Sequence, residues 1–144
     1  MILMPLALAT AAAFAGAAAY INLSEQPARL ALDDISLLKE WKPSYAKGFE
    51  MQATLALLSG LLGLAACYFE TRPAAAIGGC LMLANWPYTL LVIAPTNRKL
   101  GAIADEDAGP LSRALIRKWG KLHAGRSLLS FAATCTFVYA SVAA

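Results

Sequence analysis

The sequence is poor in the residues on which most enzyme active sites rely. Among its 144 residues there is one histidine, His123, and only 15% of the residues are charged. A single histidine excludes bis-histidine haem ligation and two- or three-histidine metal sites within one chain. The sequence also lacks GxGxxG, Walker and GxSxG patterns, so neither a nucleotide site nor a serine hydrolase is indicated.

Cysteine is scarce as well, and no CxxC spacing occurs. The three cysteines lie within apolar runs, at Cys67, Cys80 and Cys135. Because a free cysteine behaves as a small apolar residue, we expect buried free thiols rather than a redox pair. For a metal ion, the remaining combination is Glu25, Glu50 and His123 with a water, and its spacing matches no ligand motif. We therefore expect no metal site.

Apolar sequence, by contrast, is abundant. Apolar residues make up 59% of the chain, and its mean hydropathy of +0.57 is ordinary for a membrane protein and extreme for a soluble one. Several runs reach the ~20 residues that cross the hydrocarbon of a bilayer. We predict an all-α fold in which residues 1–144 form a single four-helix transmembrane bundle. Its spans are expected at about residues 1–23, 46–69, 74–95 and 120–143.

Basic residues indicate the orientation, because lysine and arginine are retained on the cytoplasmic side of a membrane. Of the twelve, only Arg72 lies in the short turn between the second and third spans. Loops 24–45 and 96–119 are therefore expected in the cytoplasm and both termini outside, in a bacterial inner membrane. The first run lacks the basic start of a secretory signal, so we expect it to be retained as a helix. No basic groove with interleaved aromatics indicates a nucleic-acid partner.

The first of these loops has the pattern of a short amphipathic helix. Asp33 or Asp34 can cap it, and its apolar side would be formed by Ile35, Leu37, Leu38 and Trp41. We expect this helix to lie on the membrane surface. Pro43 would then occupy the first turn of the second span, and Pro95 would end the third.

Polar residues gather near the cytoplasmic ends of the runs. Trp119, His123 and Arg126 are spaced i, i+4 and i+7, so they share one face of a helix. Asn85 lies deeper, close to Pro87, which removes a backbone hydrogen bond. Because polar groups at this depth are unfavourable unless they face the bundle interior or a wet cavity, we predict a polar pocket that opens toward the cytoplasmic side.

The polar and aromatic residues near these ends also have simpler interpretations. Tyr20, Tyr45 and Trp119 are typical of the aromatic belt at a membrane interface. Glu25 and Arg29, one helical turn apart, are typical of a surface ion pair. Asn85 suits a hydrogen bond to a neighbouring helix, and a lone histidine is often structural.

Four stretches resemble the anthrone oxygenase-like family of small four-helix membrane proteins: FAGAAAYINLSEQPARL, EWKPSYAKGFEMQA, LANWPYTLLVIAPTNRKL and KWGKLHAGRSLLSFAA. The most specific features are PTN at 95–97 and the later W...H..R. The positions that match the family pattern are Tyr20, Asn22, Pro27, Arg29, Tyr45, Asn85, Pro95, Asn97, Trp119, His123 and Arg126. For fungal members the resemblance implies oxidation of anthrones to anthraquinones by dioxygen, without an evident cofactor.

From this resemblance we expect a membrane-embedded oxidoreductase, of the monooxygenase kind, that acts on a lipophilic, anthrone-like substrate in the polar pocket. His123 would be the base, because histidine exchanges protons near neutral pH, and Arg126 with Asn85 or Asn97 would stabilise the enolate oxygen. The expected catalytic residues are His123, Arg126 and Asn97. The expected substrate-binding residues are Tyr20, Asn22, Glu25, Arg29, Tyr45, Gln52, Asn85, Tyr88 and Trp119.

The alternative is a non-enzymatic protein that uses the same pocket to bind or transport a lipophilic molecule, or an accessory membrane subunit. Either interpretation makes the lipid bilayer and a lipophilic small molecule its partners. The sequence leaves the formation of a homo-oligomer open.

Overall fold

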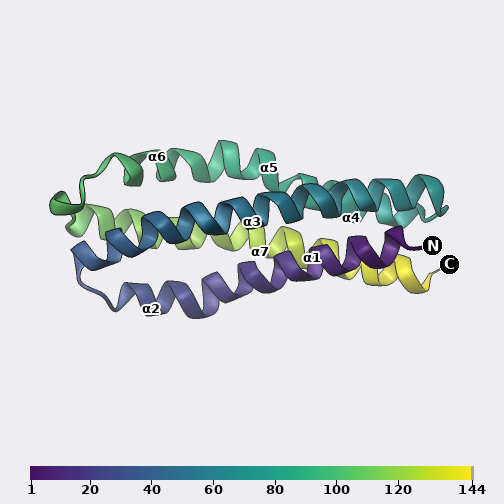
Figure 1. Cartoon of the computed structure of the whole chain (residues 1–144), viewed down its shortest axis with the longest axis horizontal. Coiled ribbons are helices and arrows are strands. Elements are labelled where there is room, and N and C mark those ends of the chain that lie inside the picture. Colours follow the sequence, from purple (N-terminus) through teal and green to yellow (C-terminus); the bar gives the residue numbers. More distant parts are fainter. Residues whose placement is uncertain (144) are drawn as a thin grey trace.

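The structure, a computed structural model that describes residues 1–143, folds these residues into four helical rods joined by short turns. In chain order the elements are α1 (Leu3–Tyr20), η1 (Ile21–Glu25), α2 (Gln26–Leu30), α3 (Asp34–Phe69), α4 (Pro73–Leu83), α5 (Asn85–Tyr88), η2 (Thr89–Ile93), α6 (Ala94–Ala102), η3 (Asp105–Asp107) and α7 (Pro110–Val142). The rods alternate in direction, so both termini lie at the same end as the α3–α4 turn (Figure 1). The predicted all-α, four-helix fold is confirmed.

Three of the rods are long and apolar enough to cross a membrane: Leu3–Leu30, Asp34–Phe69 and Pro73–Ala102. The fourth, α7, is basic through its first half and carries Arg126 at the start of its apolar half. Much of the outer surface of the bundle is apolar. Large side chains that lie exposed on it include Leu57, Leu61, Leu91, Phe131 and Val138. Buried polar groups inside and apolar side chains outside are the arrangement that lipid favours.

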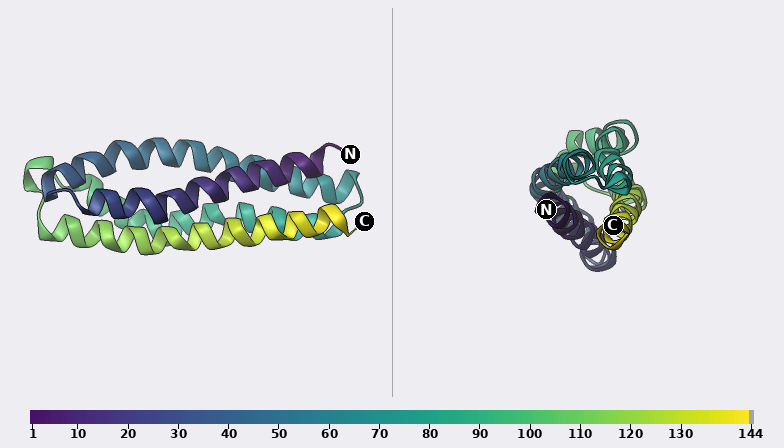
Figure 2. Two further views of the ribbon diagram at one scale, coloured as in Figure 1. Left: turned by 90° about the horizontal axis from the view of Figure 1, so that it is seen from below. Right: turned by 90° about the vertical axis from the view of Figure 1, so that its right-hand side faces the viewer.

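At the end that holds the termini, which faces the viewer on the right of Figure 2, the four rods pack against one another through small residues. Alanines of α1, α3, α4 and α7 form this core together with Phe14 and Phe137. A Cβ atom on Gly79 of α4 would lie 2.9 Å from the carbonyl oxygen of Gly60 on α3. The two helices therefore touch backbone to backbone, as expected where dispersion contacts drive helix association.

The prediction of a separate surface helix after Asp33 is wrong, because this amphipathic segment forms the start of α3. The Asp33 carboxylate caps it by accepting the N–H groups of Ile35 at 3.1 Å and Ser36 at 3.0 Å. The helix then continues through Pro43 to Phe69. Since a proline inside a helix removes one hydrogen bond, neighbouring packing compensates for the lost bond here.

That packing is the core of the opposite end. Leu37 and Leu38 are 0% exposed and Trp41 is 1% exposed, and all three pack with Trp119 and residues of η2, α6 and α7. The apolar side of the segment thus meets the other rods instead of the membrane surface. This explains why α3 begins about three turns before the predicted span.

The third rod also continues past its predicted end at Pro95. This proline lies in the first turn of α6, where a missing N–H group leaves no hydrogen bond broken, and the helix ends at Ala102. The rod is irregular further back, with a break at Ala84 between α4 and α5 and the π-helical turn η2 after Tyr88. The prediction that Pro95 ends the rod is therefore wrong, because η2 resets the hydrogen-bond register before it.

All three cysteines are free, and Cys67 is half-buried. Cys80 and Cys135 lie exposed on the outer surface, so the expectation that they are buried is wrong. On a lipid-facing surface a small apolar side chain needs no burial within protein.

Candidate functional site

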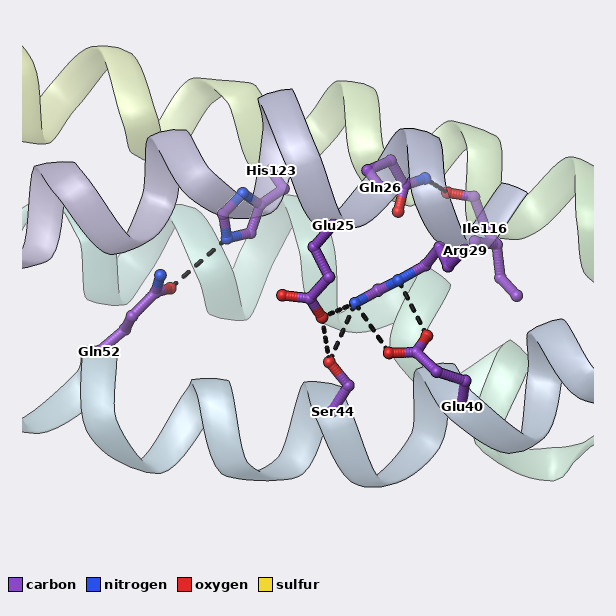
Figure 3. Close-up of polar contacts among 8 residues, drawn as sticks. All are labelled: Glu25, Gln26, Arg29, Glu40, Ser44, Gln52, Ile116 and His123. Atoms are coloured by element: carbon purple, nitrogen blue, oxygen red, sulfur yellow. Dashed lines mark hydrogen bonds and ion pairs between the residues drawn. The ribbon is translucent and has the colours of Figure 1, made fainter. Parts of the chain in front are cut away.

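His123 lies inside the bundle, where the side chain is 1% exposed. Its Nδ1 atom is 3.0 Å from Oδ1 of Asn22, and its Nε2 atom is 3.4 Å from Oε1 of Gln52. The second contact is drawn in Figure 3. The Trp119 ring, one turn earlier on α7, lies 5.0 Å from the imidazole between ring centroids. The imidazole is thus held by the first, second and fourth rods.

Asn22 determines which imidazole nitrogen carries the proton. Its Nδ2 atom donates to the carbonyl of Gly120 at 2.8 Å, and its Oδ1 atom accepts from the hydroxyl of Ser127 at 2.8 Å. Because this orientation presents an acceptor to Nδ1 of His123, that nitrogen carries the proton and Nε2 holds the lone pair. Gln52 can bond to either protonation state of the ring. Its amide oxygen accepts from Nε2–H of an imidazolium, and after a 180° rotation its amide nitrogen donates to Nε2 of a neutral ring.

A local irregularity of the first rod places Asn22. The π-helical turn η1, Ile21–Glu25, lies between the regular helices α1 and α2. Such turns are wider than an α-helix and recur at functional sites. Asn22 and Glu25 both belong to it, and their side chains contact α7 and α3 respectively.

A narrow polar hollow lies beside the imidazole, between the first rod, α3 and α7. Its lining residues are Ile21, Glu25, Arg29, Ser44, Tyr45, Gly48, Phe49, Gln52, Trp119, His123 and Arg126. Its volume of about 10 Å³ is close to the least that holds one water molecule. A larger ligand therefore requires lining side chains to move apart.

An ion-pair network closes the hollow on one side (Figure 3). Arg29, 3% exposed, pairs with Glu25 and, at 3.0 Å, with Glu40. It also donates to Ser44 at 2.9 Å, and its guanidinium lies 5.6 Å from the centroid of the Trp119 ring. Glu25 and Arg29 thus form part of an interhelical network rather than an ordinary surface pair.

Arg126 differs from Arg29 because no carboxylate pairs with it among residues 1–143. The side chain is 5% exposed, and its Nε atom has no hydrogen-bond partner within that part of the chain. Its guanidinium lies 5.2 Å from the centroid of the Phe14 ring. A buried cation without a counter-ion is unfavourable unless a ligand supplies negative charge or an acceptor.

In the two asparagines of the third rod, the side-chain nitrogens contact acceptors and the side-chain oxygens are buried without a partner. Nδ2 of Asn85 lies 3.4 Å from the carbonyl of Leu81 and 3.2 Å from that of Met82. Nδ2 of Asn97 donates to the Tyr45 hydroxyl at 2.9 Å. In the described chain neither Oδ1 has a partner. Asn85 consequently offers a ligand an acceptor, whereas Arg126 offers a donor.

Four of the nine expected binding residues do not line the hollow. Asn22 bonds to His123 without lining it, and Asn85 lines a separate cleft. Tyr20 is 62% exposed and occupies the outer surface, as its belt interpretation expects. The Tyr88 hydroxyl donates to the carbonyl of Leu122 at 2.8 Å, and its ring packs on Gly125, so Tyr88 joins the third rod to α7. Asn97 reaches the hollow only through Tyr45.

The sequence analysis did not identify four other polar residues of the site. Glu40 and Ser44 belong to the Arg29 network, Ser127 holds Asn22, and Gln26 donates to the carbonyl of Ile116 at 2.9 Å (Figure 3). Ser127 is four residues after His123. That helical spacing was the one sequence signal that could have revealed it.

The acidic residues do not assemble into a metal site. Within residues 1–143 no group of three or more histidine, cysteine, aspartate or glutamate side chains is close enough together to hold a metal ion. Glu50 is exposed and pairs with Lys47 at 3.5 Å. The combination of Glu25, Glu50 and His123 is therefore not formed.

Sequence comparison places these features in a family. The family model described as anthrone oxygenase matches residues 41–136, which is 96 of 144 residues. The chain belongs to the anthrone oxygenase family. The match covers Gln52, Asn85, His123 and Arg126, whereas Asn22 and the rest of the first rod lie outside it.

A curated relative extends this comparison. An anthrone oxygenase of Claviceps purpurea (strain 20.1) is 31% identical over 108 residues, which cover 67% of this chain and 62% of the relative. The chain thus matches less than two thirds of that protein's length. No solved structure matches the chain.

Proposed function

We propose that this protein is a membrane-embedded oxygenase that oxidises a lipophilic, anthrone-like aromatic substrate with dioxygen. Family membership supports an oxygenase-like role. The observation that carries the proposal is that a base and an unpaired cation line the same hollow. With Nδ1 of His123 bonded to Asn22, Nε2 would act as the base, and Arg126 has no carboxylate partner among residues 1–143.

The first step is the removal of a proton from the carbon opposite the substrate carbonyl. Nε2 of His123 accepts this proton, while Arg126 binds the carbonyl oxygen, on which negative charge develops. The Nδ1–H group of the resulting imidazolium remains bonded to Asn22, and Gln52 accepts from Nε2. The chain thus stabilises both charges formed in the step.

The second step consumes dioxygen. The electron-rich enolate transfers an electron to O2, and the two radicals combine to form a carbon–oxygen bond. The imidazolium returns its proton to the peroxide. The same carbon then loses its second hydrogen as a proton while the O–O bond breaks, which forms the new ketone and releases hydroxide. The hydroxide takes up that proton to become water. One O2 therefore converts the CH2 group into C=O plus one H2O, with the carbanion itself as the reductant.

Oxidation of anthrone by the purified protein in lipid nanodiscs tests this proposal. Oxygen uptake and the absorbance of anthraquinone are measured against protein-free discs, which correct for autoxidation. His123→Ala is expected to lower the protein-dependent rate at least about 100-fold, as loss of a general base does. Arg126→Lys is expected to lower it about 100- to 1000-fold, as loss of an oxyanion donor does.

Lys121→Ala is the matched control, since Lys121 is exposed on the same helix. Its rate should equal that of the wild type. Full activity in both His123→Ala and Arg126→Lys would refute the mechanism. Recovery of unchanged anthrone bound to wild-type protein, without oxygen uptake, would instead support the alternative of a lipophile-binding protein.

For the location we propose the bacterial inner membrane, with the α2–α3 and α6–α7 connections in the cytoplasm. The concentration of lysine and arginine at that end of the bundle supports this orientation. A cysteine introduced at Lys118 should react with an impermeant maleimide only after cells are permeabilised. Reaction in intact cells would reverse the orientation.

A further inference from the structure

A second cleft lies on the side of the bundle that faces lipid, between α3 and the α5–η2 segment. Its mouth is formed by exposed or half-buried side chains, among them Trp86 (38% exposed), Leu90 (56% exposed), Phe49 and Ala53. At its inner end lie three buried polar side chains, those of Asn85, Thr89 and Arg126. Polarity therefore increases from the lipid side inward.

The three inner side chains each have a polar atom without a partner. Oδ1 of Asn85, Oγ1 of Thr89 and Nε of Arg126 are buried and make no hydrogen bond within residues 1–143. A buried polar group in this state is destabilising by about 1–3 kcal/mol. One acceptor, one hydroxyl and one cationic donor converge on the end of an otherwise apolar cleft. They match an apolar molecule that carries an acceptor oxygen beside a hydroxyl group.

Phe49 separates this cleft from the polar hollow. Phe49 and Arg126 line both spaces. The ring of Phe49 lies 6.5 Å from that of Trp86 at the mouth and 6.1 Å from that of Tyr45 in the hollow, between centroids. The volume of the cleft is about 10 Å³. Of the two side chains that line both spaces, Phe49 is the half-buried one, so its movement is the simplest way to connect them.

We propose that a planar aromatic substrate enters from the bilayer through this cleft, that Phe49 is the gate, and that the substrate oxygens bind Arg126, Asn85 and Thr89. This inference rests on the proposed function for the identity of the occupant. Its rings would stack on Trp86 at the mouth, because aromatic pairs add about 0.5–1.5 kcal/mol beyond area burial. With Phe49 displaced, the reacting carbon would face the hollow that holds His123.

Filling the mouth is the direct test. Ala53→Leu adds three carbons to the wall of the cleft, and Ala65→Leu, at a half-buried position of α3 that does not line the cleft, is the matched control. In nanodiscs, Ala53→Leu should raise the KM for anthrone at least 10-fold with a smaller change in kcat, and Ala65→Leu should leave both unchanged. Equal values for the two variants would overturn the proposed entrance.

Binding gives a readout that does not depend on turnover. Trp86 is 38% exposed, whereas Trp41 and Trp119 are 1% and 3% exposed, so anthraquinone in the cleft should quench mainly Trp86. The quenching should disappear in Trp86→Phe and weaken at least 10-fold in Ala53→Leu. Quenching that follows this pattern without any oxidation would retain the entrance and refute the proposed function. Unaltered quenching in Ala53→Leu would refute the entrance.

Phe49→Ala keeps the test decisive if Ala53→Leu fails to fold. Removal of the gate ring should lower the KM for anthrone and speed up anthraquinone binding, which is the opposite of a blocked mouth. Slower binding in Phe49→Ala would show that the ring is part of the binding surface rather than a gate.

Discussion

Replacement of Arg126 by methionine should stabilise the protein while it abolishes activity. The guanidinium is buried, lacks a carboxylate partner in the described chain and retains an unbonded Nε atom. Replacement of a buried ion pair by well-packed apolar residues is often neutral or stabilising by about 1–4 kcal/mol, and Arg126 has no paired carboxylate to leave behind. The contact with Phe14 is lost, which offsets about 0.5–2 kcal/mol. We expect a net gain of about 1–2 kcal/mol for Arg126→Met, because methionine has a similar length and retains most of the packing.

Arg29→Met is the matched control, and the opposite sign is expected. Arg29 is as buried as Arg126 but pairs with Glu25 and Glu40. Its removal leaves two carboxylates without their partner, and breaking a buried pair destabilises by about 3–5 kcal/mol. The same substitution at two buried arginines thus distinguishes Arg29, whose charge is paired within the chain, from Arg126, whose charge we propose is paired by a ligand.

Thermal unfolding of both variants in one detergent measures this difference. At about 2–4 °C per kcal/mol for a chain of this size, the midpoint should rise by about 2–8 °C for Arg126→Met. It should fall by at least about 6 °C for Arg29→Met. Anthrone oxidation should be lost in Arg126→Met despite its higher stability, as in other sites where function and stability conflict. Comparable destabilisation of both variants would show that Arg126 is satisfied within the protein and is not a ligand site.

Two further predictions concern the helix contacts and the orientation of the imidazole. Gly79→Ala should destabilise the protein by about 1–3 kcal/mol, because its Cβ would lie 2.9 Å from the Gly60 carbonyl oxygen. Gly16→Ala, with no atom within 4 Å of its Cβ, should be neutral or stabilising by up to about 1 kcal/mol. Thermal unfolding that ranks the two variants in reverse would contradict the close α3–α4 contact. Asn22→Leu should lower the rate of anthrone oxidation at least 10-fold, because it releases Nδ1 of His123. Ser127→Ala leaves that bond in place and should lower the rate less than 3-fold. Equal losses would show that Asn22 does not orient the ring.

The sequence predicted much of the polar site on α7 because helical spacing is a local property. Trp119, His123 and Arg126 share one face at i, i+4 and i+7, and all three are buried in the structure. The irregularity near Asn85 was also readable, since Pro87 removes a backbone hydrogen bond wherever the helix lies. The break at Ala84 between α4 and α5 agrees with that expectation.

By itself the sequence determined the four-rod, all-α architecture, because apolar runs of membrane length and backbone hydrogen-bond satisfaction leave few alternatives. Tertiary structure alone decided where the rods end and which polar groups meet. Pro43 lies within α3 beside the packed Trp41, and Pro95 lies in the first turn of α6, where the shifted register of η2 leaves its missing N–H group no hydrogen bond to lose. The position of Phe49 between two cavities, and the pairing of Arg29 but not Arg126, depend on contacts between distant segments. Local periodicity carries no information about such contacts.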